Sequence, residues 1–277
     1  MHSVFVPPPL RTFAVTSRLK QKAPFAFAGL LVLLAGDTRA APPSASDIVA
    51  AADTIRSPQG AYRVSVGLVE YVDGKARDQV ELAVHAKLYP DTHRFKNLVR
   101  YAAPPRDVGK LVLLNGSNMW FYDPASKASI RISPQQRLMG QAANGDVVTV
   151  NLALDYTAKL LGEETIQDAD RKERQVWHLE LAAATDEAMY GRLEFWIEKD
   201  SYRPVKAKFY ADSGRLLKIA YYRKYEPQLG AARATETIII DAVDGRLVTK
   251  MTYSGFRAEA AKDTWFQRDY LPRFKEE

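Results

Sequence analysis

The sequence predicts a mainly β protein whose strands form one antiparallel meander that curls into a barrel or a half-barrel. About eleven segments alternate apolar and polar residues with a period of two, at a spacing of roughly ten residues. Turn signals separate many of these segments, among them Asp73-Gly74, Asp200-Ser201 and Asp244-Gly245. Regular short strands with intervening turns are typical of an antiparallel barrel or half-barrel.

The strand-like segments fall into two blocks. At the start of the first block, Tyr62, Val64, Val66 and Leu68 share one face, and the segment that follows the turn at Asp73-Gly74 keeps the same alternation. The segments of the first block are residues 62–72, 79–89, 93–101, 109–115, 118–124 and 128–133; those of the second block are residues 176–183, 192–199, 204–211, 215–225, 235–243 and 246–256.

One strand carries four large apolar or aromatic residues in a row, from Met119 to Tyr122. Successive side chains of a strand point to opposite faces, so Met119 and Phe121 face one way, and Trp120 and Tyr122 the other. Either both faces of this strand are covered, or one face lines an apolar wall.

Two segments have helical spacing. Residues 44–57 predict one short helix, capped by Ser46 or Asp47, with Ile48 and Ile55 among the residues of its apolar stripe. Residues 133–164 separate the two strand blocks and predict a short helix that ends at Gly140. A longer helix follows, capped by Asn144 or Asp146, although its Val-Val-Thr-Val stretch also suits a strand. Such an insert could plug the open mouth of a curled sheet.

The first forty residues have the order of a signal peptide: a basic leader, the 13-residue apolar run Pro24–Gly36, and small residues ending at Ala40. The run is shorter than the roughly 20 residues that a membrane-spanning helix needs, although an N-terminal anchor is the alternative. We therefore expect residues 1–40 to be a signal peptide, cleaved after Ala40, and residues 41–277 to form a single secreted domain.

Removal of this leader changes the charge balance. The whole chain has 39 basic and 33 acidic residues, and residues 41–277 retain 34 and 32 of them, a net charge of +2. The basic character therefore lies largely in the leader, and the sequence predicts no nucleic-acid partner.

No motif for catalysis or for a cofactor is found. The chain has no cysteine, which leaves burial to stabilise the fold, and its histidines have no metal-ligand spacing. There is no nucleophile elbow, phosphate-binding loop or dinucleotide fingerprint. The adjacent Glu163 and Glu164 are typical of a solvated segment. The sequence therefore predicts a protein that is not an enzyme and has no cofactor or metal.

The segment NGSNMWFYDP (Asn115–Pro124) resembles a strand signature of the LolA-type periplasmic lipoprotein carriers. Upstream, YPDTHRFKNLVRYAAP (Tyr89–Pro104) resembles a strand pair of this family, with a longer spacing to the tryptophan. The motif order over Pro105–Gly140 resembles the branch of outer-membrane lipoprotein-sorting proteins, and FQRDYLPRF (Phe266–Phe274) resembles the tail of that branch.

This resemblance implies an incomplete, half-barrel antiparallel sheet with short helices over its open side. It also implies a periplasmic carrier that holds acyl chains of a lipid or lipoprotein in an apolar cavity. The carrier would move this cargo toward the outer membrane, with an inner-membrane exporter as the donor. The alternatives are a lipid-sensing adaptor of the same fold and, less favoured, an enzyme that acts on lipid or glycan.

Bulky apolar residues are the candidates for the wall or the lid of such a cavity, and each could equally belong to an ordinary core. The candidate lipid-binding residues are Phe95, Trp120, Phe121, Tyr122, Ile130, Ile132, Met139, Val150 and Leu154.

Overall fold

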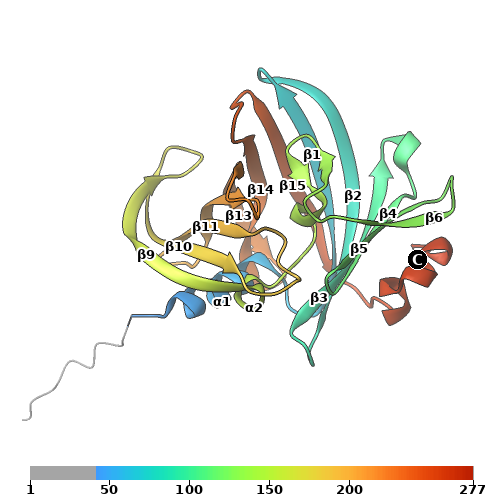
Figure 1. Ribbon diagram of the computed structural model, residues 1–277, viewed down its shortest axis with the longest axis horizontal. Helices are drawn as coiled ribbons and strands as arrows, with labels where there is room; N and C mark the ends of the chain where they lie inside the picture. The colour runs from blue at the N-terminus through green and yellow to red at the C-terminus, as the bar shows by residue number, and fades with distance from the viewer. Residues whose placement is uncertain (1–41, 277) are drawn as a thin grey trace, which may run out of the picture. The chain divides into compact units, whose positions relative to one another are not determined.

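A computed structural model describes residues 42–276 of the chain as one large antiparallel sheet with a few short helices (Figure 1). The sheet has thirteen strands and is not closed into a barrel, because β6 and β9 remain as its two edges. This confirms the predicted fold class, with more strands than the eleven expected. The predicted signal peptide, residues 1–40, lies outside the described residues.

The strand order is that of two meanders joined in the middle. The first meander runs outward from β1 to β6, the second runs inward from β9 to β15, and β1 pairs with β15. The strands of the first meander are β1 (Ala61–Val72), β2 (Lys75–Tyr89), β3 (Arg94–Ala103), β4 (Leu111–Asn115), β5 (Asn118–Asp123) and β6 (Ala128–Ile132). Those of the second are β9 (Tyr156–Gln167), β10 (Glu173–Ala183), β11 (Arg192–Glu198), β12 (Pro204–Tyr210), β13 (Leu216–Gln228), β14 (Ala231–Asp241) and β15 (Leu247–Ala258).

Alternation of apolar residues sets which face of each strand is buried. In β1, Tyr62, Val64, Val66 and Leu68 are all buried, as the sequence predicts. The turn to β2 is the two-residue loop Asp73-Gly74, in which both residues have positive φ, as this tight hairpin requires.

The first helix, α1, spans Ala45–Arg56, close to the predicted range. Its cap is Ser44 instead of Ser46 or Asp47: the Ser44 hydroxyl accepts a hydrogen bond from the Asp47 N–H, and the Asp47 carboxylate accepts one from the Ser44 N–H. This capping box satisfies two backbone donors at the helix start, which a cap two residues later would leave free. Ile48, Val49 and Ala52 face the core.

The two helices predicted between the strand blocks, a short one that ends at Gly140 and a longer one after it, are both wrong. The structure has a small two-stranded sheet of β7 (Arg137–Met139) and β8 (Ala142–Ala143), and then a 3₁₀ turn over Asn144–Asp146. Residues 147–151 are irregular, so the alternative of a strand there is also wrong, and α2 is only Leu152–Asp155. From Tyr156 onward the chain enters β9, because pairing with β10 satisfies its backbone along eleven residues and overrides the local helical spacing. We call residues 144–155 the cover segment, because Val147, Val148 and Leu152 within it pack on the main core of the sheet.

Both faces of the sheet are covered at β5. Met119 and Phe121 belong to the main core, whereas Trp120 and Tyr122 belong to a separate cluster on the opposite face. That second cluster is completed by the C-terminal segment, whose two 3₁₀ helices are Asp263–Phe266 and Arg268–Arg273. Of the two readings of this strand, the first is therefore correct. Within the described residues, no helix is long and apolar enough to cross a membrane.

Candidate functional site

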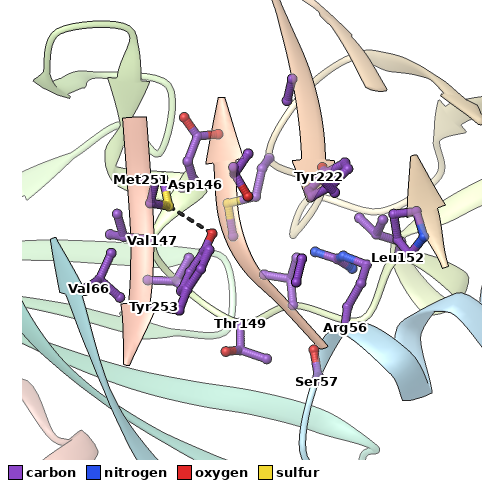
Figure 2. Close-up of a pocket in the computed structure, with 18 of the residues that line it drawn as sticks. Arg56, Ser57, Val66, Asp146, Val147, Thr149, Leu152, Tyr222, Met251 and Tyr253 are labelled. Carbon is purple, nitrogen blue, oxygen red and sulfur yellow. Dashed lines mark hydrogen bonds between the residues drawn. The ribbon is translucent and has the colours of Figure 1, made fainter. Parts of the chain in front are cut away.

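A cavity of about 150 Å³ lies between the sheet and the segments that cover the main core (Figure 2). Its lining comes from β1, β2, the start of β9 and the strands from β11 to β15, together with Met189 and Tyr190 in the loop before β11, the C-terminal end of α1 and the cover segment. The strands contribute inward-facing residues such as Val64, Val66, Ala220 and Ile239. The period-two alternation of each strand thus places an apolar wall on one side of the cavity.

Aromatic residues form much of the remaining wall. They are Tyr62, Tyr156, Tyr190, Phe209, Tyr222, Tyr225, Tyr253 and Phe256. Several of the hydroxyl groups have partners within the protein: that of Tyr225 donates to the Pro204 carbonyl, and that of Tyr253 to the sulfur of Met251 at 2.8 Å. The cavity is therefore largely apolar, with its polar atoms mostly satisfied.

Asn97 of β3 fixes the middle of the cover segment. Its side-chain amide donates to the Thr149 carbonyl and its oxygen accepts from the Thr149 N–H, both at 2.8 Å. The Thr149 hydroxyl also lies 2.5 Å from the hydroxyl of Tyr62 in β1. Asn97 is fully buried, so these bonds replace water at both ends of its amide.

A buried polar cluster joins the start of the cover segment to the sheet. The Asp146 carboxylate accepts hydrogen bonds from the ammonium of Lys218 in β13, from the hydroxyl of Tyr190 and from the backbone of Ala143. The Lys218 ammonium also donates to the Tyr190 hydroxyl at 2.8 Å. Burial lowers the pKa of Lys218 while Asp146 opposes this, and burial together with Asp146 raises the pKa of Tyr190. We call Asp146, Lys218 and Tyr190 the latch.

Asp53 of α1 connects that helix to the other end of the cover segment. One oxygen accepts from the Arg56 guanidinium at 2.7 Å, and the other accepts from the Ala153 N–H at 2.8 Å. Burial raises the pKa of Asp53 to about 6, although Arg56 and the backbone donors oppose the shift. Asp53 therefore supports α2 and orients Arg56, which lies in the cavity wall.

The nine residues predicted from sequence lie in several places. Val150 lines the cavity, and Phe95, Phe121, Ile132 and Met139 pack in or against the main core outside the cavity lining. Trp120 and Tyr122 lie on the opposite face, in the cluster covered by the C-terminal segment. Ile130 and Leu154 are 54% and 40% exposed. Binding of lipid by these nine residues stays a prediction.

Most of the lining was not predicted from the sequence, including Tyr62, Tyr222 and the charged residues Arg56, Asp146 and Lys218. One signal was available: Lys218 shares its strand parity with Ala220 and Tyr222, so a lysine occupies an inward position. In the described part of the chain, no group of three or more His, Asp or Glu residues is arranged to hold a metal ion.

Comparison with solved structures shows the family. A LolA superfamily protein from Nitrosomonas europaea matches with a TM-score of 0.73 and 32% sequence identity, over 83% of this chain and 100% of its own. The chain belongs to the LolA superfamily. A family model described only as an uncharacterized protein matches residues 94–273, and a comparison with curated proteins finds no match.

Two further structures share the fold of this LolA superfamily chain. An outer membrane lipoprotein-sorting protein domain from Vibrio parahaemolyticus has a TM-score of 0.69 at 20% identity, over 83% of this chain and 98% of its own. A DUF1329 family protein from Desulfovibrio piger has a TM-score of 0.69 at 21% identity, over 82% and 97%. The fold and the family predicted from the sequence are thus confirmed.

Proposed function

We propose that this protein is a carrier that holds acyl chains of a lipid or lipoprotein in its cavity. The observation that supports this most directly is an apolar, aromatic-lined cavity under a short cover segment, on the open sheet of a LolA superfamily fold. An acyl chain transferred from water into such a cavity gains roughly 0.8 kcal/mol for each buried methylene. Binding and release of this kind require no catalytic group.

Loading requires the cover segment to move. The cavity of about 150 Å³ is smaller than the roughly 300–1,000 Å³ of pockets that enclose drug-sized ligands. The cover segment is held by the latch at one end, by Asn97 in the middle and by Asp53 at the other end. These few polar contacts can be broken and reformed, whereas the sheet beneath keeps its backbone pairing.

The proposed site of action is the periplasm, with transfer directed toward the outer membrane. The signal-peptide pattern of residues 1–40 supports export, and the outer membrane lipoprotein-sorting domain of similar fold supports the direction. We place an inner-membrane exporter as the donor, which follows from the sequence resemblance alone. The outer-membrane acceptor is not assigned.

A cavity-filling substitution tests the proposal. Ala234 of β14 lines the cavity, so Ala234→Trp should fill it and weaken binding of the neutral fluorophore N-phenyl-1-naphthylamine at least tenfold. Ala128→Trp, at an exposed position of the edge strand β6, is the matched control and should bind as the wild type does. Equal binding by both variants and the wild type would place the fluorophore elsewhere and remove the main support for a carrier.

A further inference from the structure

The cavity contains one cationic group with hydrogen-bond donors that no described residue accepts. Only three of its lining residues carry charged side chains: Arg56, Asp146 and Lys218. Asp146 and Lys218 neutralise each other within the latch, where their side chains are 9% and 5% exposed. Both carboxylate oxygens of Asp146 are already occupied, so the latch offers no charge to a ligand.

Arg56 differs from the latch because most of its donors are free. The guanidinium uses Nη1 for Asp53, and within residues 42–276 its Nε and Nη2 have no hydrogen-bond partner. Its side chain is 23% exposed, and Figure 2 shows the guanidinium among the lining residues, below Tyr222. A guanidinium in an apolar wall with unused donors favours an anionic oxygen group, to which it can donate two parallel hydrogen bonds.

Tyr222 adds a second free group at the same place. Its hydroxyl makes no hydrogen bond to any described residue and lies near Arg56, whose charge opposes the rise in the Tyr222 pKa caused by burial. A purely apolar ligand would leave both the guanidinium and this hydroxyl without partners, which is unfavourable once water is displaced.

Asp53 balances Arg56 without competing for its free donors. One Asp53 oxygen accepts from Nη1 and the other accepts from the backbone N–H of Ala153, so both oxygens are engaged and neither bonds to Nη2. Burial raises the pKa of Asp53 to about 6, because the negative charge is less stable away from water. An anion bound to the opposite side of Arg56 would share the same positive charge.

We propose that the cavity selects amphiphiles whose head group carries an anionic oxygen, a carboxylate or a phosphate, and that this group pairs with Arg56 while the alkyl chain lies along the apolar wall. This assignment rests on the proposed carrier function and narrows its cargo from any acyl chain to an acidic amphiphile. Arg56 then determines the specificity for the head group, and the apolar residues of the strands supply the affinity for the alkyl chain of the ligand.

The test uses probes with one chain length and different head groups: dodecanoate, dodecyl phosphate and dodecanol. Each displaces N-phenyl-1-naphthylamine from the full-length mature protein. Removing Arg56 alone would leave Asp53 buried without its partner, so the informative pair is Asp53→Asn against the double variant Arg56→Gln/Asp53→Asn. The two variants differ only at position 56 and neither carries the Asp53 charge.

We expect the double variant to bind dodecanoate and dodecyl phosphate at least tenfold more weakly than Asp53→Asn does, with dodecanol changed less than twofold. Arg106→Gln, whose side chain is 70% exposed on the surface, should bind all three probes as the wild type does. Tighter binding of dodecanoate would point to a fatty-acid carboxylate, and tighter binding of dodecyl phosphate to a phospholipid head group.

Two results would overturn the inference. Equal losses for dodecanol and the two anions would mean that Arg56 acts through the packing of the cavity, and the carrier function would stand without head-group selection. Failure of the wild type to bind any of the three probes would instead contradict the proposed function itself.

Discussion

The two faces of the sheet are both apolar, yet they are covered in different ways. Over the main core, the cover segment leaves a cavity and is held by a few buried polar contacts, namely the latch, Asn97 and Asp53. Over the opposite face, the C-terminal segment packs aromatic rings directly on the strands, with Trp265 and Phe266 almost completely buried. In the proposed carrier, the first cover opens to load the ligand, whereas the second stays in place as core.

This difference shows that an apolar strand face does not by itself identify a binding cavity. In β5, Met119 and Trp120 are neighbours in sequence, but one packs in the main core and the other under the C-terminal segment. Substitutions on the C-terminal side should therefore change stability alone. Substitutions on the cover-segment side should change both stability and ligand binding.

The largest effect is expected for Trp265→Ala on the C-terminal side. Trp265 is 4% exposed. The centroid of its ring lies 5.2 Å from that of Phe274 and 5.4 Å from that of His85, both in edge-to-face contact. Loss of so large a buried ring should lower the free energy of unfolding by about 3–5 kcal/mol, measured by urea denaturation. Binding of N-phenyl-1-naphthylamine at urea concentrations below the unfolding transition should stay within twofold of the wild type. A tenfold loss of affinity would show that the two faces are coupled and would contradict the comparison.

The next largest effect on stability is expected for Asp146→Ala, on the cover-segment side. It leaves the Lys218 ammonium buried without its carboxylate, which should lower the free energy of unfolding by about 3 kcal/mol. Because the latch is broken, N-phenyl-1-naphthylamine should also associate faster in stopped-flow fluorescence. The matched double variant Asp146→Asn/Lys218→Met removes both charges and should recover most of the stability while keeping the faster association. An unchanged rate in both variants would show that the latch does not limit opening.

Asp53 should make stability depend on pH. Its pKa of about 6 in the folded protein exceeds its ordinary value of 3.8, so between these values the folded chain binds more protons than the unfolded chain. The contribution of Asp53 to the free energy of unfolding therefore falls as pH rises, by about 2 kcal/mol between pH 4.5 and 7. The difference between the wild type and Asp53→Asn, measured by urea denaturation across this range, should show that slope. A difference that is flat, or that grows with pH, would contradict the buried state of this carboxyl.

Asn97→Leu should have the smallest effect of the four. It removes both amide hydrogen bonds to Thr149 and should lower the free energy of unfolding by about 1–2 kcal/mol. Hydrogen exchange of the Thr149 N–H should increase much more than exchange in β1, because only the cover segment is released. Equal increases in both places would mean that the cover segment opens only with the whole sheet.

Much of the fold could be predicted from the sequence because strand alternation is local. The buried face of β1 and the two-faced character of β5 follow directly from period-two spacing. The strand β9 could not be predicted in this way, because its apolar residues also have helical spacing and the antiparallel pairing with β10, the next strand along the chain, decides its conformation.

The site was predictable only in part. The presence of an apolar cavity follows from the family resemblance, but its wall depends on which strands the cover segment meets. Strand alternation places Trp120 and Tyr122 on the face opposite the main core, and the distant residues 263–273 cover that face, which spacing within β5 does not indicate. Arg56 belongs to the wall because α1 ends beside the sheet, a contact between distant parts of the chain that spacing within the helix does not indicate.

Native mass spectrometry of the protein purified from the cells that produce it tests the central claim most directly. The carrier account predicts a one-to-one complex with a lipid or lipid-bearing molecule, and extraction followed by mass analysis would identify it. An empty protein that also fails to bind N-phenyl-1-naphthylamine would contradict the account and favour a role as an adaptor for another protein.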